Sequence, residues 1–135
     1  MGPVVTAGGL RDPSAYPDRE RAWREVYEAR RVAYLAALLT DALIAEHAAN
    51  PLGLGPGFYS PALQRVVDGF RTQPIRARYE FIDAGGVFDL VAVEPGRAPV
   101  VVPGARYATF PEAVHGLFLR RVAEVRDRVA EHHDG

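Results

Sequence analysis

The sequence predicts a small α+β domain, and three observations indicate this class. Apolar residues recur every three or four positions over residues 18–49 and again over 109–131, which is the spacing of an amphipathic helix. Residues 75–82 instead alternate between apolar and charged side chains, as in a half-buried strand. The chain has 135 residues, of which 48% are hydrophobic and 24% charged, and this matches one soluble globular domain.

An extended arm is expected before the domain. Residues 1–17 contain three prolines and three glycines, which deny the segment a regular helix or an interior strand. We therefore expect an arm over 1–17, a single domain over 18–131 and a polar tail over 132–135. The chain start lacks the charged and apolar regions of a secretory signal, and the longest apolar block, 32–39, is shorter than the ~20 residues of a membrane span. A cytoplasmic protein without a membrane segment is expected.

Two helices are predicted after the arm. The long one begins at Asp18, a suitable N-cap, and ends before Pro51, because the residue before a proline is driven out of the helical region. Its block 32–39 is apolar nearly all round, so we expect it to need cover on several sides and to stay partly uncovered when the chain is alone. The short helix begins at Ser60, its N-cap, and ends before Pro74. Its expected buried face consists of Leu63, Val66, Val67 and Phe70.

Three strands and a last helix complete the domain. After the strand at 75–82, a turn at 83–86 leads to a second strand at 87–93, and a turn at 94–96 leads to a short third one around 100–102. An antiparallel meander is the simplest arrangement. Thr109, with Glu112 three residues later, forms a capping box that opens the final helix. The expected buried face of this helix consists of Val114, Leu117, Phe118, Val122, Val125 and Val129.

Composition removes several kinds of chemistry. The chain has no cysteine, which excludes disulfides, thiolate metal sites and cysteine nucleophiles. All 16 basic residues are arginine, so lysine Schiff bases and the lysine-containing Walker phosphate loop are excluded as well. The formal net charge of −1 gives no overall field that would attract nucleic acid or an anionic membrane.

No catalytic, cofactor-binding or metal-binding residue is predicted in this chain. The 4 histidines lack the spacing of a catalytic zinc site such as H-E-x-x-H. His47 is interpreted as a helix-terminating residue whose positive charge suits the helix dipole. Ser60 is better explained as a cap than as a nucleophile, and the glycines of 53–57 follow a helix and are interrupted by proline, unlike a nucleotide-binding loop.

Exposed aromatic residues are the candidate functional feature. Tryptophan, tyrosine and arginine are enriched where protein interfaces carry binding energy. Residues of these types interleave with arginines along the long helix and in the loop after it, and they fit an interface or the chain's own core equally well. The candidate interface residues of this kind are Trp23, Tyr27, Tyr34, Phe58 and Tyr59.

The order short helix, three strands, helix is also that of a double-stranded-RNA-binding domain. Such a domain places basic side chains at the start of its last helix, where they meet phosphates. Here that position reads Thr109-Phe110-Pro111-Glu112, which is apolar and acidic. A stand-alone α+β adaptor or RNA-binding-like module is therefore kept only as the alternative function.

Four blocks of the sequence resemble the small subunit of bacterial N,N-dimethylformamidase. They are RDPSAY with the nearby DR, EHAANPLG, SPALQRV followed by FRTQP, and EAVHGLFLRR, in this order between about residues 11 and 128. The meander between Pro74 and Thr109 departs from the family apart from its strand pattern and Tyr79.

The resemblance implies a non-catalytic subunit of an amidohydrolase that splits dimethylformamide into formate and dimethylamine. It further implies a large partner subunit carrying a mononuclear iron with tyrosine and glutamate ligands, two small and two large chains per complex, and no role for nucleic acid or membrane. Arg11, Asp12 and Tyr16 of the arm are then expected to lie along the large subunit. Arg65 and Arg71, on the polar side of the short helix, are expected to reach its carboxylates.

Overall fold

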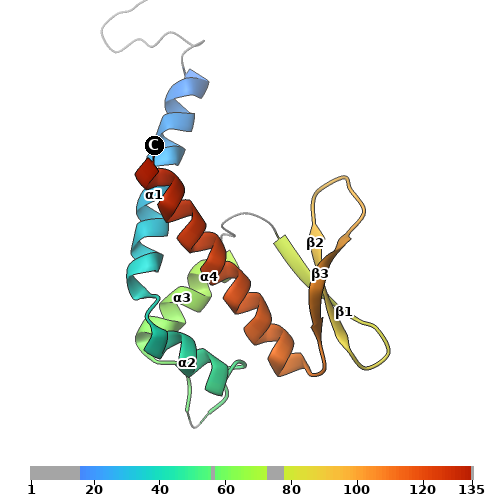
Figure 1. Ribbon diagram of the computed structural model, residues 1–135. Coiled ribbons are helices and arrows are strands. Elements are labelled where there is room, and N and C mark those ends of the chain that lie inside the picture. The colour runs from blue at the N-terminus through green and yellow to red at the C-terminus, as the bar shows by residue number, and fades with distance from the viewer. Residues whose placement is uncertain (1–15, 56, 73–77, 135) are drawn as a thin grey trace, which may run out of the picture. The chain divides into compact units, whose positions relative to one another are not determined.

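A computed structural model of the protein describes residues 16–55, 57–72 and 78–134. Within these ranges the elements follow the order that the sequence predicts, except that the predicted long helix is divided into two, and the α+β class is confirmed (Figure 1). Arg11 and Asp12 of the arm lie outside the described residues. The elements are α1 (Tyr16–Leu38), α2 (Asp41–Ala49), α3 (Pro61–Thr72), β1 (Arg78–Asp83), β2 (Phe88–Val93), β3 (Val100–Tyr107) and α4 (Phe110–Asp134).

The chain divides into two compact units, Met1–Arg31 and Val32–Gly135. The described part of the first unit is the N-terminal portion of α1, which ion pairs between neighbouring turns stabilise. Arg21 pairs with Asp18, and Arg24 donates to Glu20 at 2.8 Å. The second unit contains the remaining elements and the hydrophobic core.

The predicted single helix over 18–49 is wrong in one respect, because the helix ends at Leu38 and a second helix begins at Asp41. Thr40 has an extended backbone, and its hydroxyl accepts a hydrogen bond from the backbone N–H of Leu43 at 3.1 Å. This is an N-cap, and Asp41 places a negative charge in the first turn of α2. The apolar pattern continues across the break, which is why periodicity alone does not reveal it.

One core lies among the helices of the second unit. Val32 and Leu35 of α1 are 0% and 2% exposed, and Leu39 and Leu43 are also buried. Tyr34 points the other way and is 53% exposed. The chain itself thus covers one side of this stretch and leaves Tyr34 in water, which agrees with the expectation that the block stays partly uncovered when the chain is alone. The core consists of Val32, Leu35, Leu39, Leu43, Leu63, Val66, Phe70, Phe118, Val122 and Val125.

Helix α3 has the predicted cap, and its buried face matches the prediction except at Val67, which is half-buried. The hydroxyl of Ser60 accepts from the backbone N–H of Leu63 at 3.3 Å, and Leu63, Val66 and Phe70 are buried. At the start of α4, Thr109 accepts from the backbone N–H of Glu112 at 3.3 Å, as the capping box predicts.

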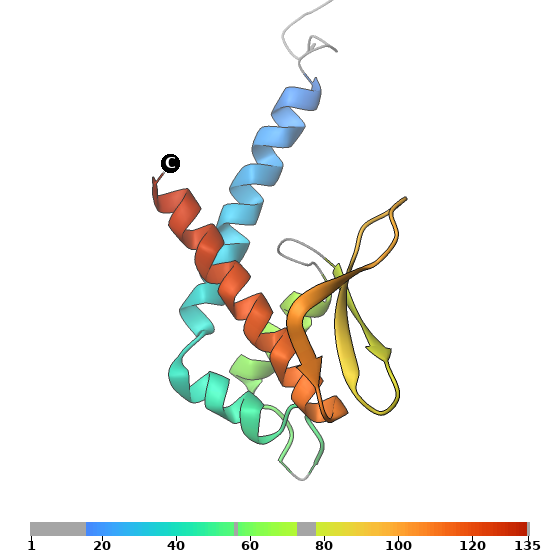
Figure 2. The same ribbon diagram turned by 45° about the vertical axis from the view of Figure 1, so that its right-hand side comes forward.

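The three strands form an antiparallel sheet in the order β1-β2-β3. Figures 1 and 2 show the sheet standing beside the first half of α4. The Phe110 ring at the start of α4 meets Phe81 and Phe88 edge-on, with ring centroids 5.6 and 5.7 Å apart. These ring contacts anchor the sheet to the helix. Leu90 of the central strand is fully buried.

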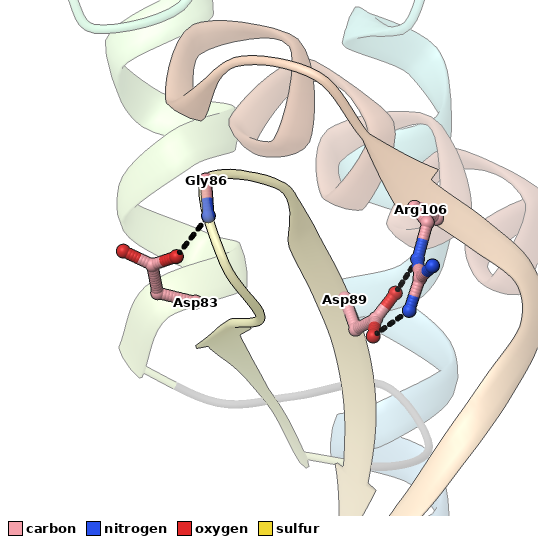
Figure 3. A network of polar contacts seen from close by, with 4 residues as sticks. All are labelled: Asp83, Gly86, Asp89 and Arg106. Carbon is pink, nitrogen blue, oxygen red and sulfur yellow. Dashed lines mark hydrogen bonds and ion pairs between the residues drawn. The ribbon is translucent and has the colours of Figure 1, made fainter.

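The third strand is longer than the predicted 100–102, because it continues past a bulge to Tyr107. Asp89 pairs with Arg106 and Val91 pairs with Val101, so the single residue Leu90 of β2 faces the four residues 102–105 of β3. Gly104 in this stretch has a φ of +75°, which glycine adopts at little cost. Beyond the bulge, Arg106 donates two hydrogen bonds to Asp89, at 2.7 and 2.8 Å (Figure 3).

The turn between β1 and β2 is closed by a side chain. The Asp83 carboxylate accepts from the backbone N–H of Gly86 at 3.0 Å (Figure 3). This contact holds the turn that the sequence predicts at 83–86.

Candidate functional site

Two histidines from different helices meet in the interior of the second unit. The Nδ1 atoms of His47 in α2 and His115 in α4 are 2.8 Å apart. The His47 ring is 2% exposed and stacks on Phe118, with centroids 3.9 Å apart and planes 10° from parallel. One ring must donate and the other accept, so at least one of the two facing nitrogens carries no proton.

Burial keeps these histidines neutral. Desolvation lowers the pKa of His47 to about 4, and the neighbouring His115 lowers it further, while Glu46 acts in the opposite direction. Burial also lowers the pKa of His115. The interpretation of His47 as a positive charge for the helix dipole is therefore wrong, because desolvation outweighs the attraction of the carbonyl ends.

The residue before His47 connects α2 to α3. The two carboxylate oxygens of Glu46 accept from the backbone N–H and the hydroxyl of Ser60, both at 2.7 Å. The same hydroxyl accepts a hydrogen bond from the backbone N–H of Leu63, so it caps α3 and binds Glu46 at the same time.

The loop between these helices is held by Asn50 and Tyr59. The Asn50 amide donates to the carbonyls of Leu54 and Gly57, at 3.0 and 2.6 Å, and its oxygen accepts from the N–H of Leu54 at 3.2 Å. The Tyr59 hydroxyl donates to the carbonyl of Pro51. Burial raises the pKa of Tyr59, and the nearby Arg71 counteracts this effect.

A third polar cluster joins the sheet to α4. Glu124 accepts from the Tyr79 hydroxyl at 2.8 Å and from Arg121 at 3.0 Å. The Arg121 and Glu124 side chains are only 8% and 10% exposed, and the guanidinium lies 4.8 Å from the centre of the Tyr79 ring. Burial and the bond to Glu124 raise the pKa of Tyr79.

A groove of about 450 Å³ lies between the α2–α3 loop, α3, β1 and α4. Its floor is apolar and includes Val67, Phe70, Val114, Leu117 and Phe118. Arginines from three elements line it as well, namely Arg71, Arg78 and Arg121. We refer to it as the arginine groove.

The candidate interface residues differ in their surroundings. Trp23 and Tyr27 of the first unit are 71% and 60% exposed. In the second unit Tyr34 and Phe58 are 53% and 73% exposed, and Arg65 and Arg71 are exposed on α3. Tyr59 instead packs against the core, and Tyr16 begins α1.

Within the second unit, the structure brings together only two of these candidates. Tyr59 and Arg71 line the arginine groove, whereas Tyr34, Phe58 and Arg65 do not. Their assignment to an interface stays a prediction.

Sequence reasoning did not anticipate the pairings of His47 with His115 and of Tyr79 with Glu124. The available signal was the position of each histidine within an otherwise apolar helical stretch, which is compatible with burial. The partners lie 68 and 45 positions apart, so only the tertiary fold makes them neighbours.

The histidine pair does not fit a metal site. Two nitrogens that bind one metal at ~2.1 Å in tetrahedral geometry lie roughly 3.4 Å apart, farther than the 2.8 Å seen here. Among the residues that the structure describes, no three His, Cys, Asp or Glu side chains are grouped so that they can hold a metal ion.

No single helix in the described ranges is both long and apolar enough to cross a membrane, and only α1 and α2 taken as a bent pair meet the criterion of length and composition.

Comparison with known proteins places these features in a family. The family model described as N,N-dimethylformamidase alpha subunit matches residues 12–133. The N,N-dimethylformamidase alpha subunit of Alcaligenes sp is 36% identical over 126 residues, covering 90% of this chain and 94% of the relative. That of Paracoccus aminophilus is 34% identical over 125 residues, covering 89% and 87%. Both matches extend over the helices and the sheet alike, and the chain belongs to the family of N,N-dimethylformamidase alpha subunits.

Proposed function

We propose that this chain is a non-catalytic subunit of an amidohydrolase that cleaves N,N-dimethylformamide to formate and dimethylamine. Its role is to assemble with, and stabilise, a large subunit that carries the catalytic iron. The names of its relatives support an alpha subunit within a multi-subunit enzyme. We propose two small and two large chains per complex, acting in the cytoplasm.

The observation that carries this proposal is the structural use of the polar residues in the family-like blocks. Glu46 caps α3 through Ser60, and Asn50 holds the loop. His47 and His115 face each other where α2 meets α4. Groups that would serve acid-base chemistry elsewhere are thus occupied in holding the fold together.

The exposed aromatic residues support the role in assembly. Trp23, Tyr34 and Phe58 each leave more than half of their surface in water. Covering a large apolar side chain contributes about 1.5–3 kcal/mol, and tryptophan and tyrosine are typical anchors of interfaces. A partner subunit is the natural cover for them.

Co-expression with the large subunit of an N,N-dimethylformamidase tests the proposal. We expect a stable complex that hydrolyses dimethylformamide, with iron that stays with the large subunit after separation. We expect no amide hydrolysis and no stoichiometric metal in the isolated small chain. About one tightly held iron per isolated small chain would contradict the proposal.

Two variants separate assembly from catalysis. Deletion of residues 1–16 or Arg71→Ala is expected to lower the fraction of assembled complex, while turnover per intact complex stays unchanged. If the assembled fraction is unchanged and turnover per complex collapses, the small chain contributes to the active site and the assignment as non-catalytic is wrong.

Co-purification also discriminates the alternative of a stand-alone adaptor or RNA-binding-like module, which predicts no large partner. The exposed first turn of α4 presents Pro111 and Glu112, which gives phosphates no attraction.

A further inference from the structure

We infer that the arginine groove binds an acidic segment of the partner subunit, with one apolar side chain of that segment inserted between α3, β1 and α4. This inference rests on the proposed function, because it specifies the partner surface that the small chain recognises. It concerns a surface separate from the exposed aromatic residues of the first unit.

Charge is the first argument. Among the described residues that line the groove, none is acidic and three are arginines, although the whole chain has a net charge of −1. Arg121 already pairs with the buried Glu124. Arg71 and Arg78 are exposed, and neither forms an ion pair with a carboxylate of the described residues. The positive charge at the rim is thus left for carboxylates of another chain.

The apolar floor is the second argument. Phe70 and Phe118 close its base and are 8% and 4% exposed, whereas Phe110 at the edge is 43% exposed. A volume of about 450 Å³ accommodates a large apolar side chain together with neighbouring backbone. Side chains that insert into such pockets at the centre of an interface contribute much of the binding energy.

The combination favours a peptide segment over a small anion. A free carboxylate would satisfy Arg71 and Arg78 but leave the apolar floor in contact with water. A segment that places Asp or Glu next to a leucine- or phenylalanine-like residue satisfies both parts at once. We therefore expect the groove to bind a segment in which an acidic residue flanks a large apolar residue.

Charge reversal in the full complex tests this inference. The double variant Arg71→Glu, Arg78→Glu is expected to raise the Kd of the small chain for the large subunit by ~100-fold, in line with the loss of close charge pairs at interfaces. Arg97→Glu is the matched control, since Arg97 is 79% exposed and pairs with Glu94 in the turn between β2 and β3. It is expected to change the Kd less than threefold.

The occupant itself can be identified by cross-linking. The chain has no cysteine, so Leu52→Cys places a single thiol at the groove, at a residue that is 38% exposed. A benzophenone attached there is expected to cross-link, in the assembled complex, to an acidic segment of the large subunit. The same label at Arg97→Cys is the control. A cross-link to this chain itself, or only to a non-acidic segment, would overturn the inference.

The outcomes separate the two proposals. If the wild-type small chain forms no complex with the large subunit, the proposed function fails. If the complex forms and the double variant binds as tightly as wild type, with an unchanged urea midpoint that shows an intact fold, the arginine groove is not the recognition surface. Loss of the cross-link in millimolar formate or acetate, with assembly unaffected, would identify a small-anion site instead and would likewise overturn the inference.

Discussion

His47 and His115 share one proton position between two stacked rings, the first buried and the second half-buried, and this makes the fold sensitive to acid. Protonating both rings would place two positive charges on nitrogens 2.8 Å apart. A charge on His47 would have almost no water to solvate it, because His47 is 2% exposed. The pair is therefore stable only while it remains neutral overall.

The first prediction concerns stability between neutral and acidic pH. The unfolded His47 titrates near 6.5 and the folded one near 4, so the unfolded chain binds more protons between these values. The free energy of unfolding should therefore fall as the pH drops through this window, by ~2–4 kcal/mol in total. Urea unfolding of the isolated chain at several pH values measures this decrease.

Two variants test whether His47 causes this decrease in the free energy of unfolding. His47→Phe keeps a ring against Phe118 and should remove most of the decrease, whereas His132→Gln, at an exposed position on α4, should retain it. Equal decreases in wild type and His47→Phe would show that other groups are responsible.

A second prediction concerns Gly116, where α4 meets the end of β3. A Cβ atom added at this position would lie 2.2 Å from the Tyr107 ring, so the ring or the helix would have to move. Alanine normally stabilises a helix interior by about 1 kcal/mol relative to glycine. Here we expect Gly116→Ala to destabilise by ~1–3 kcal/mol, because overpacking outweighs propensity.

The double variant provides the control for Gly116. In a Tyr107→Ala background the obstacle is gone, and Gly116→Ala should then raise the urea midpoint. A rise of the midpoint in the wild-type background too would show that Tyr107 moves aside at no cost.

At the scale of elements, helix α3 depends on a cap that is shared with α2. Ser60 accepts from Leu63 and donates to Glu46, so one hydroxyl serves two helices. Loss of an N-cap residue typically costs ~0.5–2 kcal/mol. We expect Ser60→Ala to cost about 2 kcal/mol, the upper end of this range, because it leaves Glu46 with one partner fewer.

A double-mutant cycle measures this coupling. Ser60→Ala and Glu46→Ala remove the same contact, so the double variant should be destabilised by clearly less than the sum of the single variants. Urea unfolding of the four proteins gives the interaction free energy. Simple additivity would show that Glu46 and Ser60 act independently.

The elements also show how far the sequence alone could lead. Ser60 and Thr109 were readable as caps because a hydroxyl precedes a proline or a glutamate at the expected spacing. Thr40 has the same role, yet it lies inside a continuous apolar pattern that concealed it. A proline followed by a glycine, as at Pro103 and Gly104, usually ends a strand. Only the pairing of Arg106 with Asp89 shows that the strand resumes after them.

The site was less predictable than the fold for a physical reason. Helices and hairpins depend on neighbours in sequence, whereas the arginine groove collects Arg71, Arg78 and Arg121 from three elements. Trp23 and Tyr27, in contrast, lie on a helix that has no apolar partner among the described residues of its own unit, and the sequence left interface and core equally open.

At the scale of the whole molecule, the isolated chain has a core of its own together with uncovered aromatic residues. Val32, Leu35 and Leu39 are buried by the chain itself, so we expect a cooperative urea transition without the partner. Trp23 and Tyr27 remain in water, and we expect the isolated chain to self-associate at high concentration through them.

Sedimentation of a variant pair tests this expectation. Trp23→Ser with Tyr27→Ser should keep the isolated chain monomeric with an unchanged urea midpoint, and should weaken binding of the large subunit. Leu119→Ser, at a residue that is 42% exposed on α4, is the control and should self-associate as wild type does. Equal self-association of wild type and both variants would show that the self-association surface lies elsewhere.

The bulge in β3 has a consequence for what the sheet itself can do. β1 and β3 are its two edges, and the edge of a sheet is a template on which further strands, and eventually fibrils, can grow. Pro103 lacks a donor for such growth, and the positive φ of Gly104 bends the strand away from a flat ladder. The β3 edge is thus a poor template for backbone pairing along this stretch. These two residues therefore protect the chain from aggregating by strand addition at this edge.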